Sequence, residues 1–173
     1  MSLREVKDKL IARLLTRYPA LVRRWAGGRE FVSRAGEENP WTPLTKPLDE
    51  CRVALVTTGG LHLKSQLPFD MKNPDGDPTF REIPSSVPRG EITITHNYYD
   101  HRSADRDINV VFPLDRLADL AAEGLIAGVV PFHLSFMGHI DGPLIEKLID
   151  EEAPEAARRL MEAGADCVLL TPA

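Results

Sequence analysis

The densest group of side chains able to do chemistry lies in residues 95–107, which include three aspartates and two of the chain's five histidines. These histidines, His96 and His101, would point about 140° apart on a helix and would not share one face of a strand. A metal site built on them therefore requires a looped backbone and a third ligand that the spacing does not fix. A substrate-recognition surface, or a loop that hydrogen-bonds its own backbone, is the alternative, and we predict no metal.

A glycine pair, Gly59 and Gly60, follows an apolar, β-branched run and precedes His62. Glycines at the end of a strand let backbone N–H groups approach an anion such as a carboxylate or a phosphate. The segment carries neither G-x-G-x-x-G nor a Walker lysine, so it does not indicate a nucleotide site. A plain tight turn explains the pair equally well.

His133 lies at the tail of another apolar run, and with His139 it flanks residues 134–138. Reactive groups of open α/β sheets gather at the carboxyl ends of strands, which makes His133 a candidate site residue. A hydrogen-bonded core histidine is the equal alternative. No serine lies in G-x-S-x-G, so the sequence does not favour serine nucleophilic catalysis.

The two cysteines, Cys51 and Cys167, are far apart in the chain and form no C-x-x-C motif or zinc-ligand spacing. Cys167 lies within an apolar run and is expected to be buried, whereas Cys51 precedes such a run and is expected to be partly exposed. The sequence therefore predicts no dithiol within these residues.

Composition restricts the class of protein. A chain of 173 residues suits one core, and the net charge of −5 without a dense Lys/Arg tract argues against a nucleic-acid partner. The amino terminus mixes acidic and basic residues, unlike a signal peptide or a membrane span. We expect a cytoplasmic protein that contacts no membrane and needs no cofactor.

Apolar periodicity predicts the elements that position these residues. Helical spacing over the first two dozen residues, split by Pro19, indicates one or two helices, followed by a proline-containing connector. A proline-rich excursion over 67–88 is long enough to suggest a functional loop. The predicted strands are 52–58, 92–95, 126–132 and 166–171, and the predicted helices are 113–123 and 142–164, the second interrupted by Pro154.

Strands that alternate with helices predict an α/β fold. We expect a Rossmann-like, mainly parallel sheet with helices on both faces, preceded by amino-terminal helices. Residues 1–48 form the helical lead-in and connector, and residues 49–173 form the α/β domain. Gly59, Gly60, His96 and His133 are expected to converge at one sheet edge. The last strand is expected to be buried and the domain incomplete at its carboxyl end, since parallel sheets are covered on both faces.

Six ordered segments, residues 56–62, 76–84, 95–100, 107–116, 132–138 and 165–172, resemble the selenoprotein B family of glycine/sarcosine/betaine/D-proline reductases. The resemblance covers about residues 50–173. It implies reductive cleavage of a small amine or amino acid with a disulfide as acceptor. It also implies a pyruvoyl-containing partner subunit and a selenoprotein A-like partner, and a homo-oligomer is left open.

In that family a selenocysteine-x-x-cysteine or cysteine-x-x-cysteine motif follows the strand that resembles 165–172. The catalytic nucleophile is therefore expected after Ala173, and the 173-residue form is expected to be inactive alone. One interpretation is that a UGA codon meant as selenocysteine is read as stop. The alternative is a non-catalytic module that binds small molecules or partners, and an unrelated α/β module with an anion or metal site is a third.

The resemblance assigns substrate binding or partner orientation to residues in the matching segments. Gly59 and Gly60 would act through their backbone, and the side chains assigned are His62, Arg81, His96, Asp100 and Asn109. His133 joins this set because of its place on a strand tail.

Overall fold

A computed structural model describes residues 3–26 and 42–173 of the chain. These described residues fall into two compact units, one with residues 3–26, 42–45 and 97–100 and one with residues 46–96 and 101–173. In the first unit, helix α1 spans Leu3–Arg17 and helix α2 spans Pro19–Ala26. Pro19 opens α2, where a residue without an N–H is tolerated because that N–H has no partner within the helix. Most of the predicted connector lies outside the described residues.

The second unit is built on β1 (Arg52–Thr57), the first strand predicted from the sequence. It pairs in parallel with β5 (Gly128–Val129), β6 (Phe132–Ser135) and β7 (Cys167–Thr171). Val56 pairs with Leu134 and also with Leu170, so β6 and β7 flank β1 on opposite sides. The parallel pairing expected around this strand is therefore present.

Two further strands make the architecture mixed rather than purely parallel. β3 (Arg81–Pro84) lies in the excursion predicted to be irregular and pairs antiparallel with β6. β2 (Leu61–Leu63) and β4 (Ile92–Ile94) form a separate antiparallel pair, so the predicted strand 92–95 exists but does not join the main sheet. The observed fold is thus a mixed α/β fold.

The strand predicted over 126–132 is interrupted in the structure. Val130 and Pro131 separate β5 from β6. Pro131 has no N–H to continue a ladder, which explains why the strand breaks there. Its carbonyl instead accepts a hydrogen bond from the Ser85 N–H at 2.9 Å.

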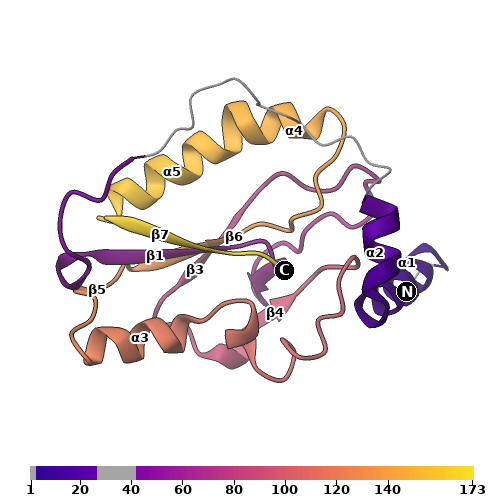
Figure 1. Cartoon of the computed structure of the whole chain (residues 1–173). Helices are drawn as coiled ribbons and strands as arrows, with labels where there is room; N and C mark the ends of the chain where they lie inside the picture. The colour runs from indigo at the N-terminus through magenta and orange to yellow at the C-terminus, as the bar shows by residue number, and fades with distance from the viewer. Residues whose placement is uncertain (1–2, 27–41) are drawn as a thin grey trace. The chain divides into compact units, whose positions relative to one another are not determined.

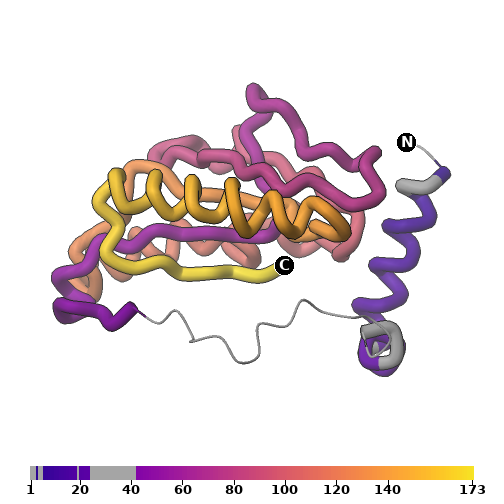
Figure 2. The backbone as a smooth tube through the Cα atoms, turned by 90° about the horizontal axis from the view of Figure 1, so that it is seen from above, coloured from indigo at the N-terminus to yellow at the C-terminus, as the bar shows by residue number. Residues whose placement is uncertain are grey.

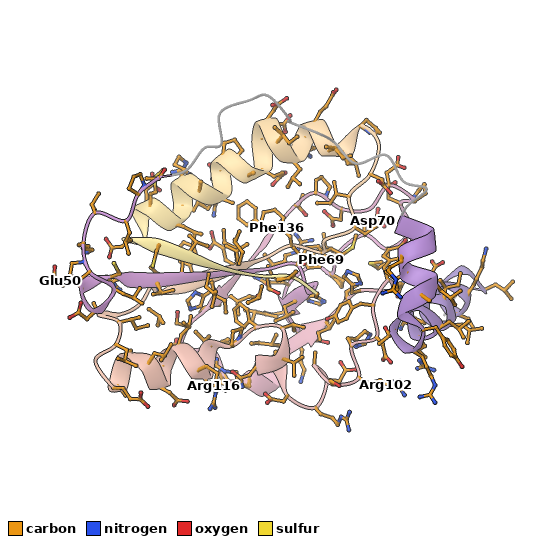
Figure 3. All side chains as sticks on the ribbon, viewed as in Figure 1. Glu50, Phe69, Asp70, Arg102, Arg116 and Phe136 are labelled. Atoms are coloured by element: carbon orange, nitrogen blue, oxygen red, sulfur yellow. The ribbon has the colours of Figure 1, made fainter. Side chains whose placement is uncertain are left out.

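Helices lie on both faces of the main sheet (Figure 1). α5 (Ala153–Glu162) covers one face, where Leu160 packs into a cluster with Ala54 and Leu134. Figure 2 shows this helix lying over the strands, and Phe136 fills the space beneath it (Figure 3). α3 (Leu114–Ala122) covers the opposite face.

The remaining helical segments are short. α4 (Leu144–Lys147) runs through a π-helical turn, η4 (Leu148–Glu152), into α5, so Pro154 falls in the first turn of a helix as predicted. Three 3-10 turns complete the unit: η1 (Leu48–Glu50), η2 (Arg89–Glu91) and η3 (Ile108–Val110). Within the described ranges, no helix has the length and apolar character needed to cross a membrane.

The expectation that the last strand is buried is wrong. β7 pairs with β1 alone among the described residues and is therefore an edge strand. The exposed fractions of Val168, Leu169 and Leu170 are 43%, 41% and 70%. An apolar run predicts burial on both faces only for a central strand, whereas α3 and α5 leave this edge partly open.

Candidate functional site

The carboxyl ends of β1, β6 and β7 meet in one cluster of hydrogen bonds, which we call the carboxyl edge. The Thr58 N–H donates to the Thr171 carbonyl at 3.1 Å, and the Phe136 N–H donates to the Thr57 carbonyl at 2.8 Å. The hydroxyls of Thr57 and Thr171 both donate to the carbonyl of Val111, at 2.8 and 2.9 Å. Residues from three strand ends are thereby fixed relative to one another.

The glycine pair forms a tight turn at this edge. Gly60 has φ +70°, and a Cβ added there would lie 2.6 Å from the Thr95 carbonyl oxygen. Its N–H donates to the Phe136 carbonyl at 2.9 Å, and the Gly59 N–H donates to the Thr57 hydroxyl at 3.1 Å. Both amides are thus directed at protein acceptors, which favours the tight-turn interpretation over an anion cradle.

A second close approach joins the loop after β6 to the loop after β1. Gly138 has φ +83°, and an added Cβ would lie 2.9 Å from both Cβ and the carbonyl oxygen of Thr58. Gly76, at φ +94°, packs in the same way against the carbonyl of His139. Because these two glycines carry no Cβ, the loop after β6 can approach Thr58 closely, and the loop that carries Gly76 can pack against His139.

His96 is the titratable residue placed at this edge. Its side chain is almost fully buried, and a ring N–H is hydrogen-bonded to the Met137 backbone carbonyl. Burial lowers the pKa of His96 to about 4, with a smaller contribution from His101 and His139 and against the effect of that hydrogen bond. The imidazole is therefore neutral at pH 7, and the ring nitrogen that faces the Met137 carbonyl carries the proton.

His62 lies on β2 with both ring nitrogens engaged. Nδ1 lies 2.8 Å from the Leu63 carbonyl and Nε2 lies 2.8 Å from the Thr95 hydroxyl. Because a carbonyl can only accept, Nδ1 donates and Nε2 accepts from the hydroxyl. His62 therefore positions Thr95, the residue that precedes His96.

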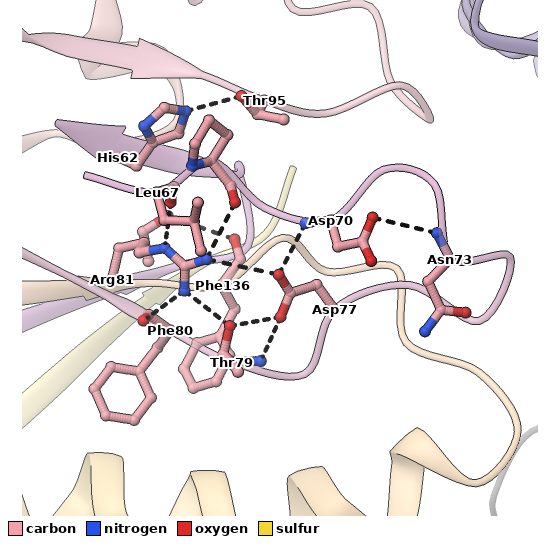
Figure 4. A network of polar contacts seen from close by, with 12 residues as sticks. His62, Leu67, Asp70, Asn73, Asp77, Thr79, Phe80, Arg81, Thr95 and Phe136 are labelled. Carbon is pink, nitrogen blue, oxygen red and sulfur yellow. Dashed lines mark hydrogen bonds and ion pairs between the residues drawn. The ribbon is translucent and has the colours of Figure 1, made fainter. Parts of the chain in front are cut away.

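Arg81 organises the loop that precedes β3 (Figure 4). Its guanidinium donates to three backbone carbonyls and one hydroxyl, those of Leu67, Pro68, Phe80 and Thr79. It also lies 3.6 Å from the Asp77 carboxylate and 4.4 Å above the ring of Phe69. Four of the five N–H groups thus donate to protein acceptors and the Asp77 carboxylate lies beside the same guanidinium, so no pair of adjacent N–H groups is left for a substrate carboxylate.

Asn109 caps helix α3. Its side-chain amide donates to the carboxylates of Asp107 and Asp115, at 2.9 and 2.8 Å, and its oxygen accepts from the Asp115 N–H at 3.1 Å. Arg89 completes the group with hydrogen bonds of 3.0 and 2.7 Å to Asp115. These residues line a pocket of about 340 Å³ between β4, η3 and the start of α3.

His133 lies inside the sheet rather than at its edge. The ring is fully buried, with Nδ1 3.0 Å from the Leu55 N–H and Nε2 3.1 Å from the Ser85 hydroxyl. Burial lowers the pKa of His133 to about 4. The geometry matches the core-histidine alternative, so Gly59, Gly60 and His96 are brought together and His133 is not.

The polar cluster after β4 does not assemble a metal centre. His101 pairs with Asp105 at 2.8 Å, and Asp100 belongs to the first unit with the amino-terminal helices. No group of three His, Cys, Asp or Glu side chains able to hold a metal occurs in residues 3–26 and 42–173.

Thr58 and Thr171 are edge residues that sequence reasoning missed. Each is a hydroxyl residue at the carboxyl end of an apolar strand, and Thr58 also accepts a hydrogen bond from the Ala173 N–H at 3.1 Å. That placement of a threonine was the available signal, because strand ends in open α/β sheets face ligands.

Comparison with known proteins decides the family. Residues 30–173 match the family described as glycine/sarcosine/betaine reductase selenoprotein B. The chain belongs to that family. The resemblance carried by the six segments is therefore confirmed.

Individual relatives have names of the same kind. The chain is 41% identical over 131 residues to D-proline reductase subunit gamma of Acetoanaerobium sticklandii, covering 76% of this chain and 52% of that one. It is 28% identical over 151 residues to the sarcosine reductase complex component B subunit beta of Peptoclostridium acidaminophilum, covering 82% and 32%. The chain thus spans about half the length of the first relative and about a third of the second, and no solved structure matches it.

Within the selenoprotein B family, the matched region includes the whole carboxyl edge. Thr58, His96, Gly138 and Thr171 all fall in the segments that resemble the family. The edge, rather than the pocket beside Asn109, is where three parallel strands end together.

Proposed function

We propose that this chain is a component of a reductase that cleaves a small amine or amino acid, and that its carboxyl edge forms part of the substrate site. The supporting observation is that β1, β6 and β7 end together beside His96, a buried and neutral histidine. Glycine, sarcosine, betaine and D-proline are the substrates to test, because the relatives and the family carry those names.

The residues at the edge would bind and orient rather than attack. His96 is fixed in orientation by its hydrogen bond to the Met137 carbonyl. The Thr58 hydroxyl supplies a polar group at the end of β1. The selenolate or thiolate that the family uses would follow β7, a pyruvoyl-containing and a selenoprotein A-like subunit would be the partners, and a disulfide would be the acceptor. No further cofactor enters this proposal.

Binding is tested by titrating the isotope-labelled chain with each of the four compounds and following backbone amide shifts. We expect the largest shifts at Thr58, Gly60 and Gly138. Thr58→Val should weaken binding several-fold, and Arg116→Gln on the outer surface of α3 is the matched control. Shifts confined to the pocket beside Asn109, or no binding by any compound, would overturn the assignment of the edge.

Turnover is tested separately with a dithiol as electron donor. The 173-residue chain should be inactive with all four compounds, since it contains no C-x-x-C motif. Extension past Ala173 through a selenocysteine- or cysteine-containing motif should restore activity. Turnover by the 173-residue chain that survives replacement of both cysteines by alanine would contradict a nucleophile supplied after β7.

A further inference from the structure

The fold brings together two cysteines that the sequence keeps apart. Cys51 directly precedes β1, and Cys167 is the first residue of β7. Cys167 pairs with Val53, and Cys51 lies two residues before Val53 on the same strand path. Side chains two residues apart in a strand share a face, and paired residues on neighbouring strands do as well. The two side chains therefore lie on the same face of the sheet as diagonal neighbours. Their Cα atoms are about 7–8 Å apart, so a disulfide between them requires a small movement of the edge strand β7.

The two thiols also influence each other. The Cys51 thiol donates to the Pro47 carbonyl at 3.3 Å. The Cys51 side chain is one of the groups that raise the pKa of the Cys167 thiol, after the larger effect of burial. The sequence predicts no dithiol because the two cysteines are remote in the chain, whereas the pairing of β1 with β7 brings their side chains to neighbouring positions.

The pair is asymmetric in its access to solvent. Cys51 is 0% exposed, whereas Cys167 is half-buried at the amino end of an edge strand. An external reagent can therefore reach Cys167 first, and Cys51 is placed to react next. This arrangement of one accessible and one buried thiol suits an attacking and a resolving cysteine.

We propose that Cys51 and Cys167 form an oxidisable dithiol site that closes into an intramolecular disulfide when a low-molecular-weight disulfide is the oxidant. The site lies at the amino end of β7, at the opposite end of the strand from the carboxyl edge, and the proposal does not depend on the proposed function. Its structural effect is to tie an edge strand held by one ladder to the segment before β1.

The reaction balances with glutathione disulfide as oxidant. The Cys167 thiolate attacks one glutathione sulfur, which forms a mixed disulfide and releases one glutathione thiolate. The Cys51 thiolate then attacks the Cys167 sulfur and releases the second glutathione thiolate. The protein loses two electrons and two protons, and glutathione disulfide gains them to become two thiols.

The groups around Cys167 set the pH range in which its thiol is oxidised. Burial raises the pKa of the Cys167 thiol, assisted by the neighbouring Cys51 and by Asp166 and opposed by Lys46. Lys46 itself is paired with Asp166 at 2.8 Å. Because the thiolate is the attacking species, oxidation should be slow at neutral pH and should accelerate above the range where a free thiol titrates.

The experiment exposes the purified chain to excess glutathione disulfide at several pH values and measures intact mass and non-reduced peptides. We expect a product lighter by two hydrogen atoms, with the peptides containing Cys51 and Cys167 linked. Cys51→Ala should instead accumulate a glutathione adduct on Cys167, and Cys167→Ala should leave Cys51 unmodified.

The intact mass of the oxidised wild-type chain reports the internal link even if a variant does not fold. Glutathione adducts that persist on the wild-type chain, or disulfide-linked dimers in place of the internal link, would overturn it. Labelling of Cys51 before Cys167 would overturn the assigned order of attack.

Discussion

The backbone N–H of Leu55 in β1 donates to Nδ1 of His133 in β6, at 3.0 Å, inside the main sheet. The ladder on this side of β1 is interrupted at Pro131, so Leu55 lies opposite a gap between β5 and β6. The imidazole replaces the missing backbone acceptor and reaches the Ser85 hydroxyl with its other nitrogen. His133 therefore satisfies a buried backbone N–H that the interruption between β5 and β6 would otherwise leave without an acceptor.

Replacement of this ring should destabilise the fold in proportion to the polar groups left unpaired. His133→Phe keeps most of the volume but leaves the Leu55 N–H without its acceptor, at a cost of about 2–3 kcal/mol. The Ser85 oxygen loses a donor, while its hydroxyl keeps its hydrogen bond to the Val130 carbonyl. His133→Asn retains an acceptor near the position of Nδ1 and should cost less. Urea unfolding compares the two variants, and equal losses would contradict the role of the Leu55 hydrogen bond.

Stability should fall as the pH is lowered between about 6.5 and 4. Burial lowers the pKa of both His96 and His133 from 6.5 to about 4, so in this window the unfolded chain binds protons that the folded chain does not. Above pH 6.5 both states are neutral and stability is complete. Each histidine contributes roughly 3 kcal/mol to the loss. Unfolding free energies at pH 7 and 4.5 measure it, and His133→Asn should flatten the dependence by about half.

Alanine substitutions at three glycines should separate the effect of steric crowding from that of backbone strain. Gly138→Ala meets Thr58 and must also adopt a positive φ, so it should cost about 2–3 kcal/mol. Gly124→Ala has φ +73° but open space around it and should cost about 1 kcal/mol. Gly90→Ala, with neither constraint, should stay within about 0.5 kcal/mol. Thermal unfolding ranks the stabilities of the three variants. If Gly138→Ala loses no more stability than Gly124→Ala, the close approach of Gly138 to Thr58 is contradicted.

Arg81→Lys should loosen the loop over residues 67–80. A lysine keeps the charge but cannot hold several carbonyls and a hydroxyl at once, so we expect a loss of about 2 kcal/mol and faster proteolytic cleavage in this loop. Arg158→Lys is the control, because Arg158 is exposed on α5 and its ion pairs with Glu155 and Glu162 contribute little. Cleavage rates that change equally in both variants would contradict the organising role of Arg81.

Local signals predicted the elements that carry strong periodicity. β1, α3, and the helix that starts near Pro154 follow from apolar runs, glycine stops and proline starts. The edge strand β3 was missed because it carries Glu82 and Pro84 and lies in a proline-rich stretch. Its pairing depends on β6, a segment about fifty residues downstream, and pairing at that distance leaves no local pattern.

Part of the site was also predictable from local signals. Gly60 and His96 were selected because each follows a strand, and the structure places them in contact range at one edge. His133 was misplaced because a residue on a strand tail can point into the sheet as easily as toward its end. The adjacency of Cys51 and Cys167 follows only from the pairing of β1 with β7.

The order of the strands also sets how the second unit can form. β1 pairs only with segments that begin at Gly128 or later, so within the described residues every ladder of this central strand is non-local. The chain loses the entropy of closing these long loops before the contacts between the strands can stabilise it. Folding therefore slows as the mean sequence separation of contacts rises. A nascent chain would therefore hold β1 unpaired until the segment after Gly128 has been synthesised, and the apolar residues Val53 and Leu55 would be open to chaperones during that interval.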